Sequence, residues 1–149
     1  MEGAGLQKSV AEKAEAFFRD WEESTAEFVD DVTSGEGKDV QSAHKDYQNK
    51  ASIQLVTFKS EICRLCKVDL PDNMLPGEGG MLPGEESNPT KIEFLPVLGY
   101  HVYTWKHEID LSLSDFLDDP KNEKAIKVLK NLPGILTDMV DDVIGELRV

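Results

Sequence analysis

Cys63 and Cys66 are the residues whose type and spacing most directly suggest chemistry in this sequence. Side chains three positions apart lie on one face of a helix, so the two thiols could share a metal ion or form a redox pair. A zinc ion needs four ligands, and His101 and His107 could supply the other two. However, these histidines are too far apart in sequence to share one helix face, and redox C-x-x-C motifs begin a helix beside a strand. We therefore expect two unreactive thiols that pack as small hydrophobic side chains, without a bound metal.

A second group that could act as general acid and base consists of His101, Glu108 and Asp110. Three aromatic residues lie near them: Tyr100, Tyr103 and Trp105. No nucleophile elbow, phosphate-binding loop or H-E-x-x-H motif accompanies these residues. We therefore predict a partly buried aromatic seam with polar edges, no catalytic residues, no cofactor and no enzymatic activity.

Four pairs of neighbouring acidic residues are the remaining candidates for metal binding. They are Glu22–Glu23, Asp30–Asp31, Asp118–Asp119 and Asp141–Asp142. Calcium-binding loops need alternating oxygen ligands around a glycine, and di-iron bundles need Glu-x-x-His on two helices. Neither pattern occurs in the sequence. We expect these pairs to lie on solvated helix faces, where they could meet a basic protein.

The charge of the chain limits the partners that it can bind. Its 149 residues include 29 acidic and 16 basic ones, which gives a net charge of -13. Such a chain repels phosphate, so we expect no nucleic-acid binding and no adsorption to anionic membranes, whereas a basic protein partner is favoured. No apolar run resembles a signal peptide or is long enough to span a bilayer, and two cysteines suit a reducing compartment. We therefore predict a soluble protein in the cytoplasm.

The elements that must position these residues are predicted to be helices. Apolar residues recur at steps of three and four along 6–33 and again along 38–68. The run 34–37 predicts the end of the first helix, and Leu70-Pro71 predicts the end of the second. Because the connection is short, the two helices are expected to form an antiparallel hairpin over residues 1–68. Residues 1–36 (ten acidic, three basic) and 37–68 (three acidic, six basic) differ in sign, so ion pairs are expected along the seam.

Residues 69–91 are expected to form a flexible loop, because four prolines and four glycines interrupt the hydrophobic periodicity. The pentapeptide Met-Leu-Pro-Gly-Glu occurs in it twice, at 74–78 and at 81–85. Its apolar residues must either fold back onto the helices or wait for a partner. A duplication in a tolerant loop explains the repeat, and so does a linear motif that binds a partner protein. The candidate partner-binding residues are Met74, Leu75, Met81, Leu82, Glu85 and Glu86.

Residues 92–117 carry two competing patterns. Apolar residues at steps of three and four favour a helix, whereas the alternation from Tyr100 to Trp105 favours a strand. We predict a helix, because the three–four pattern covers more residues than the alternation. Pro96 would then lie near the first turn or mark a kink.

The C-terminal residues predict two shorter helices. Asp118 or Asp119 can cap a helix that begins at Pro120, and Pro133-Gly134 is expected to break it before a last helix follows. Residues 92–149 would thus form the C-terminal helices of a single domain. The predicted fold is all-α, an antiparallel bundle of four to five helices with a long loop in the middle.

These observations favour a non-enzymatic protein-interaction or regulatory module. The first alternative is an acidic inhibitor or immunity-type protein that masks a basic site on a toxin or on a nucleic-acid-binding protein. The second alternative is a metal- or thiol-dependent enzyme that uses Cys63 and Cys66. Apolar stripes on a long hairpin also suit a homodimer, so the oligomeric state stays open.

Overall fold

The computed structural model describes residues 2–34, 39–70, 73–85 and 88–148, with side chains from Gly5 onward. Four helices occupy these ranges: α1 (Glu2–Thr33), α2 (Val40–Cys66), α3 (Phe94–Asp118) and α4 (Glu123–Leu147). The described residues contain no strand, so the all-α prediction is confirmed. None of the described helices is long and apolar enough to cross a bilayer. Most of the predicted helix stop at 34–37, and the candidate residue Glu86, lie outside the described residues.

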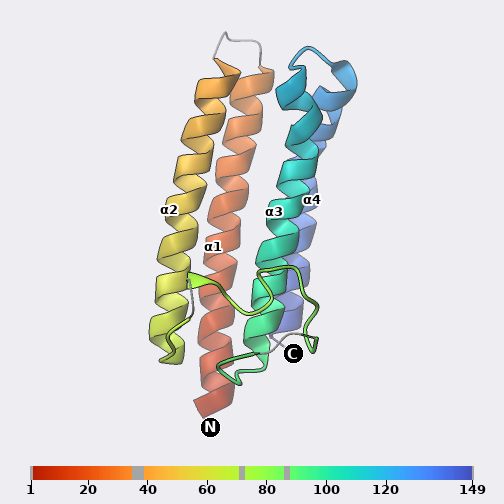
Figure 1. Ribbon diagram of the computed structural model, residues 1–149. Coiled ribbons are helices and arrows are strands. Elements are labelled where there is room, and N and C mark those ends of the chain that lie inside the picture. Colours follow the sequence, from red (N-terminus) through yellow and green to blue (C-terminus); the bar gives the residue numbers. More distant parts are fainter. Residues whose placement is uncertain (1, 35–38, 71–72, 86–87, 149) are drawn as a thin grey trace.

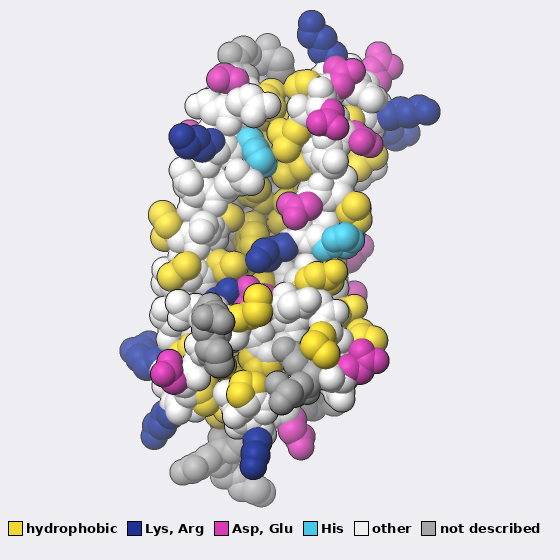
Figure 2. All heavy atoms as spheres, viewed as in Figure 1, with side chains coloured by type: hydrophobic (Ala, Val, Ile, Leu, Met, Phe, Trp, Pro, Cys, Tyr) yellow, Lys and Arg dark blue, Asp and Glu magenta, His cyan; other side chains and the backbone are white. Residues whose placement is uncertain are grey.

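The four helices lie side by side and alternate in direction along the chain (Figure 1). α1 is the central helix, since it packs against both α2 and α4, and α3 packs against α4. The predicted antiparallel hairpin of the first two helices is therefore confirmed. Between α2 and α3 runs a groove of about 230 Å³ that is lined by residues of both helices. Figure 2 shows hydrophobic side chains gathered along the middle of this face.

Aromatic side chains of α1 fill the centre of the bundle. Phe17 stacks on Phe58 of α2 with ring centroids 4.1 Å apart, and Phe18 lies 4.8 Å from the ring of Trp105 in α3. Each such pair contributes about 0.5–1.5 kcal/mol beyond the area that it buries. These contacts tie α2 and α3 to α1 rather than to each other.

The ends of α2 are set by caps. The carboxylate of Asp39 accepts a hydrogen bond from the backbone N–H two residues later, which satisfies a free donor of the first turn. At the other end, Lys67 adopts a left-handed φ of 54°, and the N–H of Val68 donates to the carbonyl of Cys63 at 3.1 Å. The helix therefore ends earlier than the predicted stop at Leu70-Pro71.

α3 confirms the prediction of a helix over residues 92–117. Pro96 lies in its first turn, where the missing N–H has no partner within the helix in any case, so the helix needs no kink there. The three–four pattern becomes its buried face. The large buried side chains of this face are Leu95, Leu98, Val102, Trp105, Ile109, Leu113 and Phe116.

α4 begins later than predicted. Its N-cap is Asn122, whose side chain accepts from the N–H groups of Lys124 and Ala125 at 3.0 and 3.3 Å. The prediction that Asp118 or Asp119 caps a helix starting at Pro120 is therefore wrong. Asp118 is the last residue of α3 and Asp119 is its C-cap, so the next residue that can cap a helix is Asn122.

Pro133-Gly134 does not break the last helix, so the expected fifth helix is absent from the described residues. Proline inside a helix costs about 3 kcal/mol, because it removes one hydrogen bond and crowds the preceding turn. Leu129, Leu132 and Leu136 are fully buried around this position, and each contributes about 1.5–3 kcal/mol on burial. Hydrophobic packing on α1 and α3 therefore outweighs the local preference for a break.

The predicted charge pairing between the first two helices is not what joins them. In the described parts of the chain, α1 and α2 share the ion pair Lys13–Glu61 at 3.5 Å, in which α1 supplies the base rather than the acid. The seam is instead held by the aromatic contacts and by Tyr47, whose hydroxyl accepts from Trp21 Nε1 at 3.1 Å. Ring packing keeps most charged side chains on the outer rims, where they are solvated.

Candidate functional site

The two copies of the pentapeptide form the same backbone turn. We call Met74–Glu78 the first pentapeptide and Met81–Glu85 the second. In each copy the N–H of the glutamate donates to the carbonyl of the leucine at 3.0 Å. The glycine between them has a positive φ, 88° at Gly77 and 96° at Gly84. Proline followed by a glycine of positive φ is the signature of a type II turn, so the local sequence dictates this shape twice.

The first pentapeptide is docked onto α3. Leu75 is 1% exposed and belongs to the hydrophobic core. A Cβ atom on Gly99 would lie 1.9 Å from the carbonyl oxygen of Pro76, and one on Gly77 would lie 2.2 Å from that of Pro96. Backbone therefore touches backbone here, and this approach requires glycine on both sides.

Glu78 fixes the first pentapeptide between α2 and α3. Its carboxylate is buried and accepts a hydrogen bond from its own turn, through the N–H of Leu75 at 2.9 Å. It also accepts from the ammonium group of Lys59 in α2, and Lys106 in α3 lies 3.9 Å away. A buried carboxylate needs such partners, because an unpaired buried charge is strongly destabilising. The loop thus bridges two helices that otherwise face each other across a groove.

The second pentapeptide has the same shape but lies at the surface. Met81 and Leu82 are each 48% exposed, and Glu85 is exposed as well. A Cβ atom on Gly84 would meet nothing within 4 Å. The second copy therefore holds two neighbouring apolar side chains at the surface in a defined turn.

The predicted partner-binding residues therefore separate into two environments. Met74, the first residue of the first pentapeptide, is exposed, whereas Leu75 lies in the core and is not accessible to a partner in this structure. Met81, Leu82 and Glu85 are all exposed.

Sequence reasoning missed Gly77, Glu78 and Gly99, which are the residues that dock the first copy. A glycine within a helical pattern was the available signal for Gly99.

The candidate metal ligands Cys63, Cys66, His101 and His107 do not gather into a metal site in the described residues. Within the described residues no group of three or more His, Cys, Asp or Glu side chains could hold a metal ion. Cys66 is buried and Cys63 is partly buried, and burial raises the pKa of the Cys66 thiol, which disfavours the reactive thiolate. The ring of His107 stacks on Tyr103, with centroids 5.9 Å apart.

The proposed acid–base group is also separated. Nε2 of His101 lies 2.9 Å from a carboxylate oxygen of Glu146 in α4, so the partner of His101 is not one of the two acids that follow it in sequence. Asp110 lines the groove between α2 and α3. Trp105 is fully buried while Tyr103 is exposed, so only part of the predicted aromatic seam is in the core.

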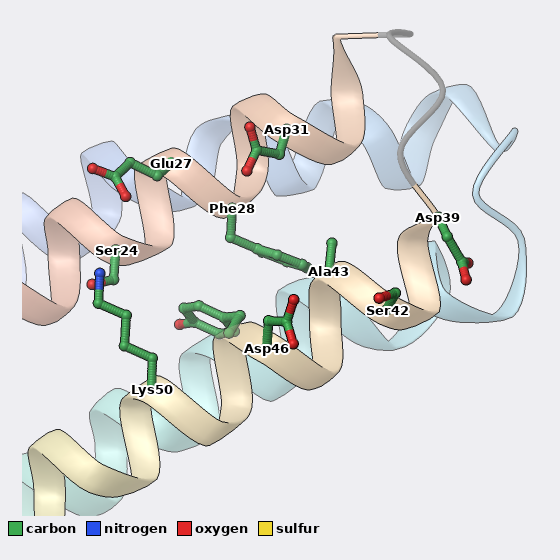
Figure 3. A pocket seen from close by; sticks show the side chains of 10 residues that line it. Ser24, Glu27, Phe28, Asp31, Asp39, Ser42, Ala43, Asp46 and Lys50 are labelled. Atoms are coloured by element: carbon green, nitrogen blue, oxygen red, sulfur yellow. The ribbon is translucent and has the colours of Figure 1, made fainter.

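An acidic groove lies between α1 and α2 near the end of the bundle where they are connected (Figure 3). Its volume is about 380 Å³, and four carboxylates and one lysine line it. These residues are Glu27, Asp31, Asp39, Asp46 and Lys50. The sequence contained a signal for this groove, because Glu27 and Asp31 are four positions apart and so share one face of α1.

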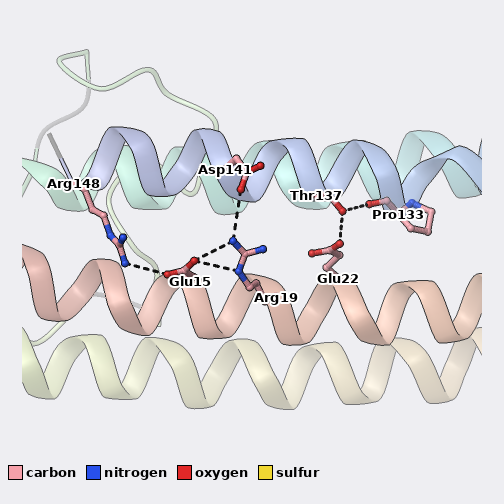
Figure 4. Close-up of polar contacts among 7 residues, drawn as sticks. All are labelled: Glu15, Arg19, Glu22, Pro133, Thr137, Asp141 and Arg148. Atoms are coloured by element: carbon pink, nitrogen blue, oxygen red, sulfur yellow. Dashed lines mark hydrogen bonds and ion pairs between the residues drawn. The ribbon is translucent and has the colours of Figure 1, made fainter.

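The acids that face α4 are partly neutralised within the chain (Figure 4). Arg19 forms ion pairs with Glu15 at 3.0 Å and with Asp141 at 3.6 Å, and Arg148 pairs with Glu15 at 3.1 Å. These are exposed pairs, each worth about 0–1 kcal/mol.

No protein-family model, curated protein or solved structure matches this chain.

Proposed function

We propose that this protein is a non-enzymatic protein-interaction module that presents the second pentapeptide to a partner protein. One observation carries the proposal: an exposed turn has the same sequence and backbone shape as a turn that binds two helices within the same chain. The docked copy thus provides an example of how this peptide is recognised.

The second pentapeptide is suited to binding because its conformation is already formed. The hydrogen bond from Glu85 to Leu82 and the positive φ of Gly84 hold the turn before any partner arrives. Such preorganisation reduces the ordering cost of association, which is about 0.5–1.5 kcal/mol for each side chain that must be immobilised. Leu82 can enter an apolar hole in the partner, and Glu85 can accept hydrogen bonds from an amine or from backbone N–H groups.

The docked copy also indicates what the partner offers. The environment of the docked copy suggests three features of the partner. It has an apolar pocket for the leucine, as the core has for Leu75, and a lysine near the glutamate, as Lys59 is near Glu78. It also has a glycine on a helix, equivalent to Gly99, where the turn can contact the backbone. A basic partner of this kind is consistent with the net charge of -13. We propose a cytoplasmic location with it, which two free thiols support.

A photo-crosslinking amino acid placed at Leu82, and in a second variant at Val128, tests this proposal. The two positions are equally exposed, at 48%, so they sample solvent alike and differ only in their surroundings. We expect a protein adduct at position 82 that is absent at 128. A peptide spanning residues 79–86 should lower the yield of this adduct by competing for the partner. The same peptide with its leucine replaced by serine should not lower it. The same adducts at both positions would contradict the proposal.

The acidic groove supports a second candidate function, the masking of a basic site on another protein. The groove can take a lysine or arginine side chain between acidic residues of the two helices. Its test is a paired substitution, Glu27→Gln with Asp46→Asn, compared with Asp138→Asn and Asp142→Asn on the exposed face of α4. Both pairs remove two charges, so masking predicts weaker, salt-sensitive binding only for the groove pair. Equal losses of binding for both pairs would show that net charge alone, and not the groove, causes the effect.

A further inference from the structure

The surface that holds the first pentapeptide has the features of a peptide-binding site. It consists of Pro96, Gly99 and Tyr100 on α3, which contact the turn backbone, and of Lys59 and Lys106, which face its glutamate. We call these five residues the turn-binding site. The contacts described above are made to a Leu-Pro-Gly-Glu turn, and the chain carries a second turn of this sequence seven residues later.

We propose that the turn-binding site is a binding site for a Leu-Pro-Gly-Glu turn and accepts the second pentapeptide in exchange for the first. In the exchanged form Leu82 occupies the apolar position of Leu75, and Glu85 replaces Glu78 beside Lys59. Gly84 then approaches Pro96 as Gly77 does. This exchange is independent of any partner protein and goes beyond the function proposed above.

Chain length permits the exchange. The first pentapeptide lies against Pro96, two residues into α3 from Phe94, so the chain need only cover a short distance from the site to the start of the helix. With the second pentapeptide bound, residues 86–93 would make this connection. Nine residue steps of 3.3–3.6 Å reach about 30 Å. On the other side, the connection from Leu70 to the bound leucine becomes seven residues longer, which a surface loop tolerates at small entropic cost.

The residues that flank the two copies explain why the first one is bound. Leu70, five positions before Leu75, is buried at 5% exposure and anchors the loop, whereas the position five before Leu82 is Gly77. After the first copy, Gly80 has a φ of 95°, and a Cβ atom on it would lie 2.9 Å from the ring of Tyr103. The matching position after the second copy is a serine in the sequence, and a residue other than glycine is strained at a positive φ. The flanking residues therefore favour binding of the first copy, although the two turns are identical.

A double-mutant cycle tests the exchange through stability. Leu75→Ala, Leu82→Ala and the double variant are unfolded in urea, and the shifts in midpoint are compared. If the second copy can replace the first, Leu82→Ala alone shifts the midpoint little, and Leu75→Ala is partly compensated. The double variant then shifts the midpoint by more than the sum of the single shifts, because no intact copy remains. Additive shifts would overturn the proposal.

Amide hydrogen exchange provides a second test. If Leu75 only stabilises the core, replacing it should not change amide protection in the second pentapeptide. In Leu75→Ala, the N–H groups of Leu82 and Glu85 should gain protection, and the gain should be independent of protein concentration. Leu132→Ala is the matched control, since Leu132 is equally buried but lies in α4. If Leu75→Ala fails to fold, Glu78→Gln weakens the first copy more gently and should produce the same gain. Unchanged amide protection in folded variants would overturn the proposal. A gain in protection that increases with protein concentration would also overturn it, because the second pentapeptide would then bind the site of another chain.

Discussion

The two pentapeptides of the loop have one sequence and one backbone turn, yet one is buried and the other is exposed. Leu75 is 1% exposed and Leu82 is 48% exposed, although each stands before the same Pro-Gly pair. The conformation of a turn and its burial are therefore determined separately. The turn is a local property of the peptide, whereas burial depends on what lies next to it.

The residues next to the first pentapeptide supply what the second lacks. Gly99 leaves room for a backbone contact, and Lys59 and Lys106 face the carboxylate of Glu78. No residue within five positions of the first copy contributes these groups, because they come from α2 and α3. The site that binds the first copy is therefore built from residues distant in sequence, although the turn itself is a local structure.

The largest contrast is expected when the glycine of each turn is replaced. Gly77→Ala should cost about 2–5 kcal/mol, since a left-handed alanine costs about 1–2 kcal/mol and crowding against Pro96 adds about 1–3 kcal/mol. Gly84→Ala should cost only the conformational part, about 1–2 kcal/mol, because nothing lies near its Cβ position. Urea unfolding of each variant measures the difference. The Gly77 variant carries Leu82→Ser and is compared with Leu82→Ser alone, so that the second copy cannot replace the first.

Equal costs at Gly77 and Gly84 would mean that the contact with α3 contributes nothing to stability. The two copies would then differ in exposure but not in how strongly they bind α3.

A smaller contrast is expected for the glutamates. Glu78→Gln leaves Lys59 without its charged partner in a buried setting, so we expect a loss of about 1–3 kcal/mol in the Leu82→Ser background. Glu85→Gln should change stability by less than about 0.5 kcal/mol, since Glu85 is exposed. Combining Glu78→Gln with Lys59→Met provides the control: the double variant should lose less than the sum of the two single losses. A loss for Glu85→Gln as large as that for Glu78→Gln would show that the turn, and not the lysine, needs the carboxylate.

The helices could be predicted from the sequence because their signals are periodic and local. α3 is an example, since the apolar steps from Leu95 to Phe116 became its buried face despite an alternating stretch inside it. Pro133 shows where this reasoning fails. Its local cost is certain, but the compensating burial of Leu132 and Leu136 against other helices is a tertiary effect that no short window contains.

The candidate site could be predicted only in part, for the same reason. The repeated pentapeptide and its apolar residues are visible in the sequence, but the two copies are identical in it, so both leucines are predicted to bind a partner. Gly99 lies 22 positions after Gly77 and in another element, so nothing near either residue indicates that their backbones meet. Similarly, Asp30 and Asp31 are predicted only as a pair on one helix face, whereas Asp31 lines a groove together with Asp46 of α2.

The smallest effect on stability, and the most informative one for function, is expected at the methionines. Met74 and Met81 begin the two copies and are similarly exposed, at 51% and 48%, so serine at either position should change stability by less than about 0.5 kcal/mol. The two substitutions nevertheless differ in what surrounds them, because Leu75 beside Met74 is buried and Leu82 beside Met81 is not. If the second pentapeptide binds a partner, Met81→Ser should reduce the crosslink yield at position 82 and Met74→Ser should leave it unchanged. An equal loss from both would assign binding to the loop as a whole and remove the distinction between the two copies.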